Sequence, residues 1–114
     1  MIDTQTPDRI ITIRHLNDRL RSKGEGGRTV LSRGIAALGP DELVAVLRAV
    51  AAFASFTEAN DPHGEHDCAI LEAGAHRVLW KIDYYDPDLG FLSPDPADPE
   101  VTRRVLTIML VEEY

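Results

Sequence analysis

The feature that most constrains the fold of this sequence is the alternation of side chains over residues 76–85. Val, Trp, Ile and Tyr occupy positions 78, 80, 82 and 84, while Leu, Lys, Asp and Tyr occupy the positions between and after them. A period of two predicts a β-strand whose first set of side chains faces a core. A shorter apolar run, 68–72, precedes it across the turn-forming pair Ala73-Gly74. Together the two runs predict an antiparallel hairpin.

Two further stretches show the spacing of amphipathic helices. The first begins at Thr6-Pro7-Asp8, an N-cap followed by proline and an acid, carries apolar residues at 10, 13, 16 and 20, and stops at Lys23-Gly24. The second begins at Gly39-Pro40 and places apolar residues at 43, 46, 47, 50 and 53 before ending at Phe56. Between them, the short β-branched run 28–32 predicts an edge strand.

The C-terminal segment is predicted to be a third helix. Asp98-Pro99-Glu100 repeats the N-cap, proline and acid pattern, and apolar residues at 101, 105, 108 and 109 follow at helical spacing. The β-branched content of 105–111 leaves a strand as the alternative. The predicted order is α-β-α-β-β-α. We expect one α+β two-layer domain, 1–114, in which helices pack on a small three-stranded, mostly antiparallel sheet.

Composition indicates one soluble globular domain. Of 114 residues, 44% are apolar and 27% charged, which argues against disorder. No apolar run approaches the roughly 18–20 residues of a membrane span, and residues 1–5 do not begin a signal peptide. A single cysteine, Cys68, excludes an intramolecular disulfide and fits a reducing compartment. We therefore expect a cytoplasmic protein with no membrane association.

The net charge of −7 is unevenly distributed along the chain. Residues 1–35 carry seven Lys or Arg against four acids, whereas residues 36–114 carry five against fifteen. Such an acidic surface repels nucleic acid and suits a basic protein surface as partner, so direct nucleic-acid binding is not expected. The basic N-terminal helix would pair with the acidic half, within one chain or between subunits, which leaves a homo-oligomer open.

Metal-ligating side chains crowd into one segment of the chain: Asp61, His63, Glu65, His66 and Asp67. Two imidazoles and one carboxylate form a ligand set of zinc and non-haem iron, so His63, His66 and Asp83 are a candidate site for zinc or another divalent metal. Glu65 would then act as the base of a small metal-dependent hydrolase. The alternative is a structured loop in which these side chains cap backbone groups, because the two histidines lack the helical spacing of known zinc motifs.

Two other chemistries find weaker support. Asp67, Lys81 and Asp83 could converge as in two-metal nucleases, although Leu79 stands where that pattern needs an acid. The alternative for Lys81 and Asp83 is a simple charge pair on one strand face. Cys68 begins an apolar strand and is expected to be an inert packed thiol rather than a nucleophile.

An interaction surface is the leading expectation, formed by aromatic residues among carboxylates: Asp83, Tyr84, Tyr85, Asp86, Asp88 and Phe91. Aromatic side chains supply contact area, and carboxylates steer a basic partner. The alternative is that Tyr84 and Phe91 pack in the core under a solvated acidic rim. The sequence thus favours a non-enzymatic interaction domain, an inhibitor or accessory of a nucleic-acid-handling complex in defence or on a mobile element.

Several long motifs carry a resemblance to a known family. They are LNDRLR (16–21), GIAALGP (34–40), FTEANDPHGEHD (56–67), WKIDYYDPDL (80–89) and SPDPADPEVTRRVLTIMLVEEY (93–114). From Ile13 to Tyr114 the chain resembles an uncharacterised bacterial family, domain of unknown function 3768. Members are typical of proteobacterial genomes and of mobile-element gene sets. The chain departs from the family pattern at Cys68-Ala69, where an aromatic residue and glycine are usual, and the resemblance implies no catalytic residues.

Overall fold

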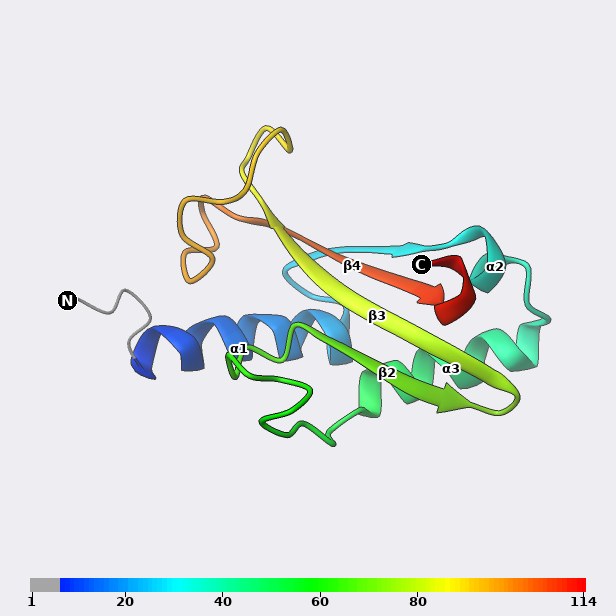
Figure 1. Ribbon diagram of the computed structural model, residues 1–114. Coiled ribbons are helices and arrows are strands. Elements are labelled where there is room, and N and C mark those ends of the chain that lie inside the picture. Colours follow the sequence, from blue (N-terminus) through cyan, green and yellow to red (C-terminus); the bar gives the residue numbers. More distant parts are fainter. Residues whose placement is uncertain (1–6) are drawn as a thin grey trace.

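The protein is built on a four-stranded sheet with its main helices packed on one face, as shown by a computed structural model that describes residues 7–114 (Figure 1). The elements are α1 (Pro7–Lys23), β1 (Gly27–Leu31), α2 (Arg33–Ala36), α3 (Pro40–Ala52), β2 (Cys68–Ala73), β3 (His76–Tyr85), β4 (Arg103–Leu110) and the 3-10 turn η1 (Val111–Glu113). The strand order is β1-β4-β3-β2. Among the strands of residues 7–114, β1 and β4 pair parallel and the other neighbours pair antiparallel. The α+β class is as predicted.

The hairpin predicted from alternation is present as β2 and β3. These strands pair antiparallel from Cys68↔Lys81 to Ala73↔His76. The turn between them uses Gly74 at φ 62°, a conformation that glycine adopts without strain. Trp80 is fully buried at the centre of the sheet's helix-facing side. The same set of alternating side chains that the sequence assigned to a core is therefore the set that packs under the helices.

The sheet has four strands rather than three, because the C-terminal segment is the strand β4 and not the predicted helix. Asp98 does form a cap, but of a turn: its carboxylate accepts a hydrogen bond from the Glu100 amide at 2.9 Å, and its carbonyl accepts one from Val101 at 3.3 Å. The chain then extends between β1 and β3 and gains backbone hydrogen bonds on both edges. Burial alternates along β4, with Leu106 and Ile108 in the core. This two-sided pairing outweighs the local helical spacing.

The second predicted helix ends earlier than expected, at Ala52. Arg21, on α1, donates hydrogen bonds from one guanidinium nitrogen to the carbonyls of Val50, Ala51 and Phe53, at 2.8–3.1 Å. A buried cation thus satisfies the carbonyls that a helix leaves unpaired at its C-terminus. Beyond the helix, Phe53 packs edge-on against Trp80. The N-cap predicted at Thr6 lies outside the described residues.

The face of the sheet opposite the helices is only partly covered. Leu79, Lys81 and Asp83 of β3 point to this face and remain partly exposed. The connection between β3 and β4, residues 86–102, extends past the end of the sheet (Figure 1). None of the helices within residues 7–114 combines the length and apolar character needed to cross a membrane.

Candidate functional site

His66 holds the 61–67 loop against α1. Its Nδ1 lies 2.9 Å from Oδ1 of Asp18, and its Nε2 lies 3.7 Å from Oδ2 of Asp61. The imidazole stacks on the Phe56 ring with 3.7 Å between centroids and 6° between planes. The Asp61 carboxylate also accepts the His66 backbone amide at 3.2 Å. Both ring nitrogens face carboxylates of the protein itself. The contact of the Asp61 carboxylate with a backbone amide is of the capping kind that the sequence left as the alternative.

The three predicted metal ligands are not brought together. His63 lines a surface hollow beside Pro7 and Ile10. Asp83 lies on the open face of β3, where its carboxylate pairs with Lys81. Side chains alternate between the two faces along β3, so Asp83 points away from the helix-facing side of the sheet. His66 lies on that helix-facing side. Throughout the part of the chain that the structure describes, no group of three His, Cys, Asp or Glu is placed to hold a metal ion.

Asp67, Lys81 and Asp83, the residues of the nuclease hypothesis, have separate structural roles. The Lys81–Asp83 pair is the charge pair expected as its alternative. The Asp67 carbonyl accepts the Ile82 amide at 2.7 Å, which fastens the loop to β3. Burial, aided by the charge of Glu65, raises the pKa of the Asp67 carboxyl. Burial also raises the pKa of the Cys68 thiol, the opposite of what an activated nucleophile requires.

A buried polar network lies between α1 and the sheet, and it contains Tyr84. The Tyr84 hydroxyl donates to Oε1 of Glu65 at 2.7 Å and accepts from Nδ2 of Asn17 at 2.8 Å. The Asn17 carbonyl oxygen accepts from Nε of Arg104 at 2.8 Å. The Arg104 guanidinium lies 5.2 Å from the centre of the Tyr84 ring, a cation–π contact. Tyr84 is therefore a partly buried residue whose ring packs against the core and whose hydroxyl belongs to this network.

Asn17 and Arg104 were not singled out from the sequence. One signal for Asn17 was available, because positions 13, 17 and 20 share one side of a helix and their neighbours there are apolar. The structure places Asn17 fully buried on that stripe. Arg104 carried no such signal, since its burial depends on β4 being a strand.

The outer end of the β3–β4 hairpin is a structured turn that exposes three large apolar side chains, those of Leu89, Phe91 and Leu92; we call residues 86–92 the tip. The Asp86 carboxylate accepts the amides of Gly90 at 3.0 Å and Phe91 at 3.4 Å. The Asp86 amide donates to the Phe91 carbonyl at 2.8 Å, and Tyr85 pairs with Leu92 across the hairpin. Phe91 and Leu92 are nevertheless 80% and 78% exposed. The tip is therefore ordered by the hydrogen bonds of Asp86 and leaves its apolar side chains in water.

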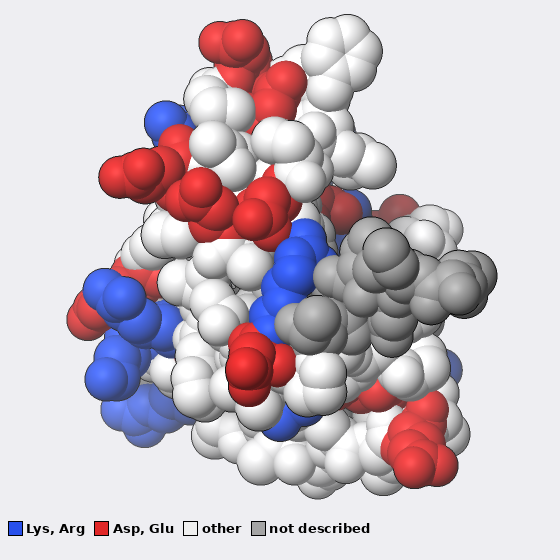
Figure 2. Space-filling view, turned by 90° about the vertical axis from the view of Figure 1, so that its left-hand side faces the viewer, with Lys and Arg blue, Asp and Glu red and all other residues white. Residues whose placement is uncertain are grey.

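Carboxylates surround the tip. Residues 83–100, which we call the acidic segment, contain six Asp or Glu and no Lys or Arg. Asp95 pairs with Arg9 at 2.8 Å, whereas Asp88 and Glu100 make no ion pair within residues 7–114. Figure 2 shows Asp and Glu concentrated among uncharged residues in the upper part of one face, while Lys and Arg gather mainly at its lower left and further acids lie in its lower half. Without Tyr84, whose hydroxyl is part of the polar network, the acidic aromatic surface expected from the sequence consists of Tyr85, the carboxylates and the tip.

Comparison with known proteins identifies a family but no characterised relative. Residues 31–113 match the family described as protein of unknown function (DUF3768). No curated protein and no solved structure shows a significant match to the chain. The matched residues include β2 to β4, the acidic segment and the tip, whereas α1 and all of β1 except Leu31 precede them. Because the match covers more than half of the sequence, the chain belongs to the family of proteins of unknown function DUF3768.

Proposed function

We propose that this chain is a protein-interaction domain that binds a basic partner through the tip and the acidic segment. The observation that carries the proposal is the exposure of Phe91 and Leu92 on a hydrogen-bonded turn at the end of the sheet. Exposed apolar side chains scattered singly are ordinary, but two adjacent ones on an ordered projection form a contact patch.

The order of the tip adds to affinity. Because Asp86 already fixes the turn, a partner would not have to order it on binding. Large apolar side chains on such a turn act as anchors that fill pockets of the partner, and anchors of this kind dominate binding energy. Burying a side chain the size of Phe91 or Leu92 contributes about 1.5–3 kcal/mol.

Charge defines the class of partner. The acidic segment contains six carboxylates with no cation among them, so it attracts a basic surface and raises the association rate at low salt. Proteins that handle nucleic acid carry basic surfaces of this kind. A role as accessory or inhibitor of such a complex is therefore part of the proposal. The alternative of a metal-dependent hydrolase draws no support from the arrangement of His63, His66 and Asp83.

A random-peptide display library, selected on the purified protein, tests the proposal without a known partner. We expect enriched peptides to combine Lys or Arg with apolar residues. The double variant Phe91→Ala with Leu92→Ala should weaken the selected peptides at least roughly thirtyfold, about 2 kcal/mol. Val44→Ala is the matched control, because Val44 is an exposed aliphatic residue of α3. Peptides that bind the double variant as tightly as the unaltered protein would show that the tip is not the contact.

Separate variants test the electrostatic part of the proposal. Asp88→Lys and Glu100→Lys should slow association and flatten its salt dependence, because neither carboxylate has a structural partner within residues 7–114. Asp86 is unsuitable, since its carboxylate holds the turn. Glu72→Lys, near the opposite end of β3, is the control for net charge. Equal effects of Glu72→Lys and Asp88→Lys would refute a localised basic contact.

A further inference from the structure

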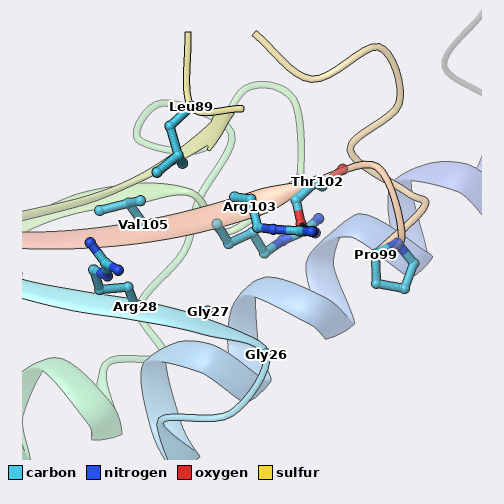
Figure 3. A pocket seen from close by; sticks show the side chains of 9 residues that line it. Gly26, Gly27, Arg28, Leu89, Pro99, Thr102, Arg103 and Val105 are labelled. Carbon is cyan, nitrogen blue, oxygen red and sulfur yellow. Dashed lines mark hydrogen bonds between the residues drawn. The ribbon is translucent and has the colours of Figure 1, made fainter. Parts of the chain in front are cut away.

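A pocket of about 430 Å³ lies where the parallel strands β1 and β4 begin (Figure 3). It borders the tip through Leu89 and the acidic segment through Pro99, but its arginines have no part in the proposed function. Its apolar wall comes from Leu89, Pro99 and Val105, and its cationic groups include Arg28 and Arg103. The volume falls in the range of roughly 300–1,000 Å³ that is usual for small-molecule sites.

The pairing of β1 with β4 sets the position of these side chains. Arg28 is the register partner of Val105, so both point to the same face of the sheet. Arg103, two residues before Val105, points to that face as well. Figure 3 shows Arg28 beside Val105 at one end of the pocket and Arg103 beside Thr102 at the other, with Leu89 above β4. The pocket is thus an apolar surface with a guanidinium group at each end.

Both guanidinium groups lack an acidic partner in the part of the chain that is described. The seven ion pairs there include neither Arg28 nor Arg103. Arg103 makes only a long hydrogen bond, 3.4 Å, to the Thr102 carbonyl. In a chain of net charge −7, two unpaired arginines that share one apolar pocket leave their planar donor groups available to an anion.

We propose that this pocket binds a small organic dicarboxylate. Each carboxylate pairs with one arginine, and the apolar segment of the ligand lies against Leu89 and Val105. Guanidinium and carboxylate match in planar geometry, and the bond between them is charge-assisted. A polyanion such as nucleic acid would instead meet the carboxylates of the acidic segment, which repel it.

Titration of the ¹⁵N-labelled protein with adipate, hexanoate, phenyl phosphate and hexylammonium tests the proposal. We expect adipate at millimolar concentration to shift the amide signals of Leu89 and Val105. Hexanoate and phenyl phosphate should bind roughly tenfold more weakly, because each engages one arginine, and hexylammonium should not bind. Arg28→Gln and Arg103→Gln should each reduce adipate affinity roughly tenfold. Arg77→Gln is the control, because Arg77 is exposed on β3 and lines neither this pocket nor the surface hollow at His63.

Each contrary result overturns a defined part of the proposal. Absence of shifts at Leu89 and Val105 with adipate refutes the site. Equal affinity for adipate and hexanoate refutes the two-ended ligand, and tighter binding of phenyl phosphate refutes the carboxylate. An equal loss in Arg77→Gln shows that the effect is one of net charge. The variants at Phe91 and Leu92 should leave adipate binding unchanged, so failure of the tip and failure of the pocket are distinguishable.

Discussion

Removal of a single buried hydroxyl tests the polar network between α1 and the sheet. Tyr84→Phe deletes the donor to Glu65 at 2.7 Å and the acceptor of Asn17 at 2.8 Å, while the ring remains under the Arg104 guanidinium. A hydrogen bond to a charged acceptor contributes about 1.5–3 kcal/mol, and the Asn17 amide keeps one partner, the Glu65 carbonyl at 3.0 Å. We therefore expect a loss of about 2–3 kcal/mol in the free energy of unfolding.

Urea denaturation monitored by fluorescence measures this loss. The chain has one tryptophan, Trp80, which is fully buried and so changes environment on unfolding. For a domain of this size a loss of 2–3 kcal/mol corresponds to a fall of about 10–20 °C in Tm. The urea dependence of the free energy should stay constant, because the substitution exposes no additional surface in the unfolded chain.

Tyr85→Phe is the matched control, because Tyr85 is the next residue on the same strand but points to the open face. Its hydroxyl makes no hydrogen bond in the described part of the chain, so we expect a change within about 0.5 kcal/mol. If both variants unfold at the same urea concentration, the network contributes nothing to stability and the reasoning is wrong. Loss of peptide binding in Tyr84→Phe with unchanged stability would return Tyr84 to the interaction surface.

Two further predictions concern burial of charge and close packing. Burial and the nearby Glu65 raise the pKa of Asp67 above its usual 3.8, so the native state loses stability as pH rises through the raised value. Asp67→Asn should therefore stabilise the protein at pH 7 and make no difference below pH 3.8, and equal urea midpoints at pH 7 would contradict this. A Cβ at Gly27 would lie 2.6 Å from the Arg104 carbonyl oxygen, so Gly27→Ala should cost about 1–3 kcal/mol by the same assay. Gly90→Ala, with no atom within 4 Å of its Cβ, should change stability by less than about 0.5 kcal/mol and is the control.

Local patterns in this sequence predicted local structure well. The β2–β3 hairpin follows from alternation around Trp80 and from a glycine at the turn, both of which act within a few residues. The same alternation puts Tyr84 on the face of β3 that carries Trp80, where its partly buried ring packs against the core. Phe91 shows the limit of such patterns, because its exposure follows from hydrogen bonds of Asp86 that fix the turn.

Features that depend on long-range pairing could not be predicted. Residues 105 and 108–109 fit a helix stripe, and only the two neighbouring strands make the segment a strand. β1 pairs with β4, a contact between segments far apart in sequence. This pairing buries Arg104 and forms the pocket at Arg28. His66 likewise reaches Asp18 across a long separation, which no spacing between histidines could reveal. The metal hypothesis combined the two histidines with Asp83 and missed this carboxylate.

The central position of β4 has a consequence for folding during synthesis. Within residues 7–114, β1 pairs with β4 alone, from Gly27↔Arg104 to Leu31↔Ile108, so β1 stays unpaired until β4 has been made. Closing so long a loop costs entropy before any contact repays it, which slows folding. A nascent chain that ends before residue 103 would hold the β2–β3 hairpin with an unpaired edge. The domain therefore completes its sheet only after residues 103–110 emerge, and until then the exposed edge of β3 is a site for chaperone binding or aggregation.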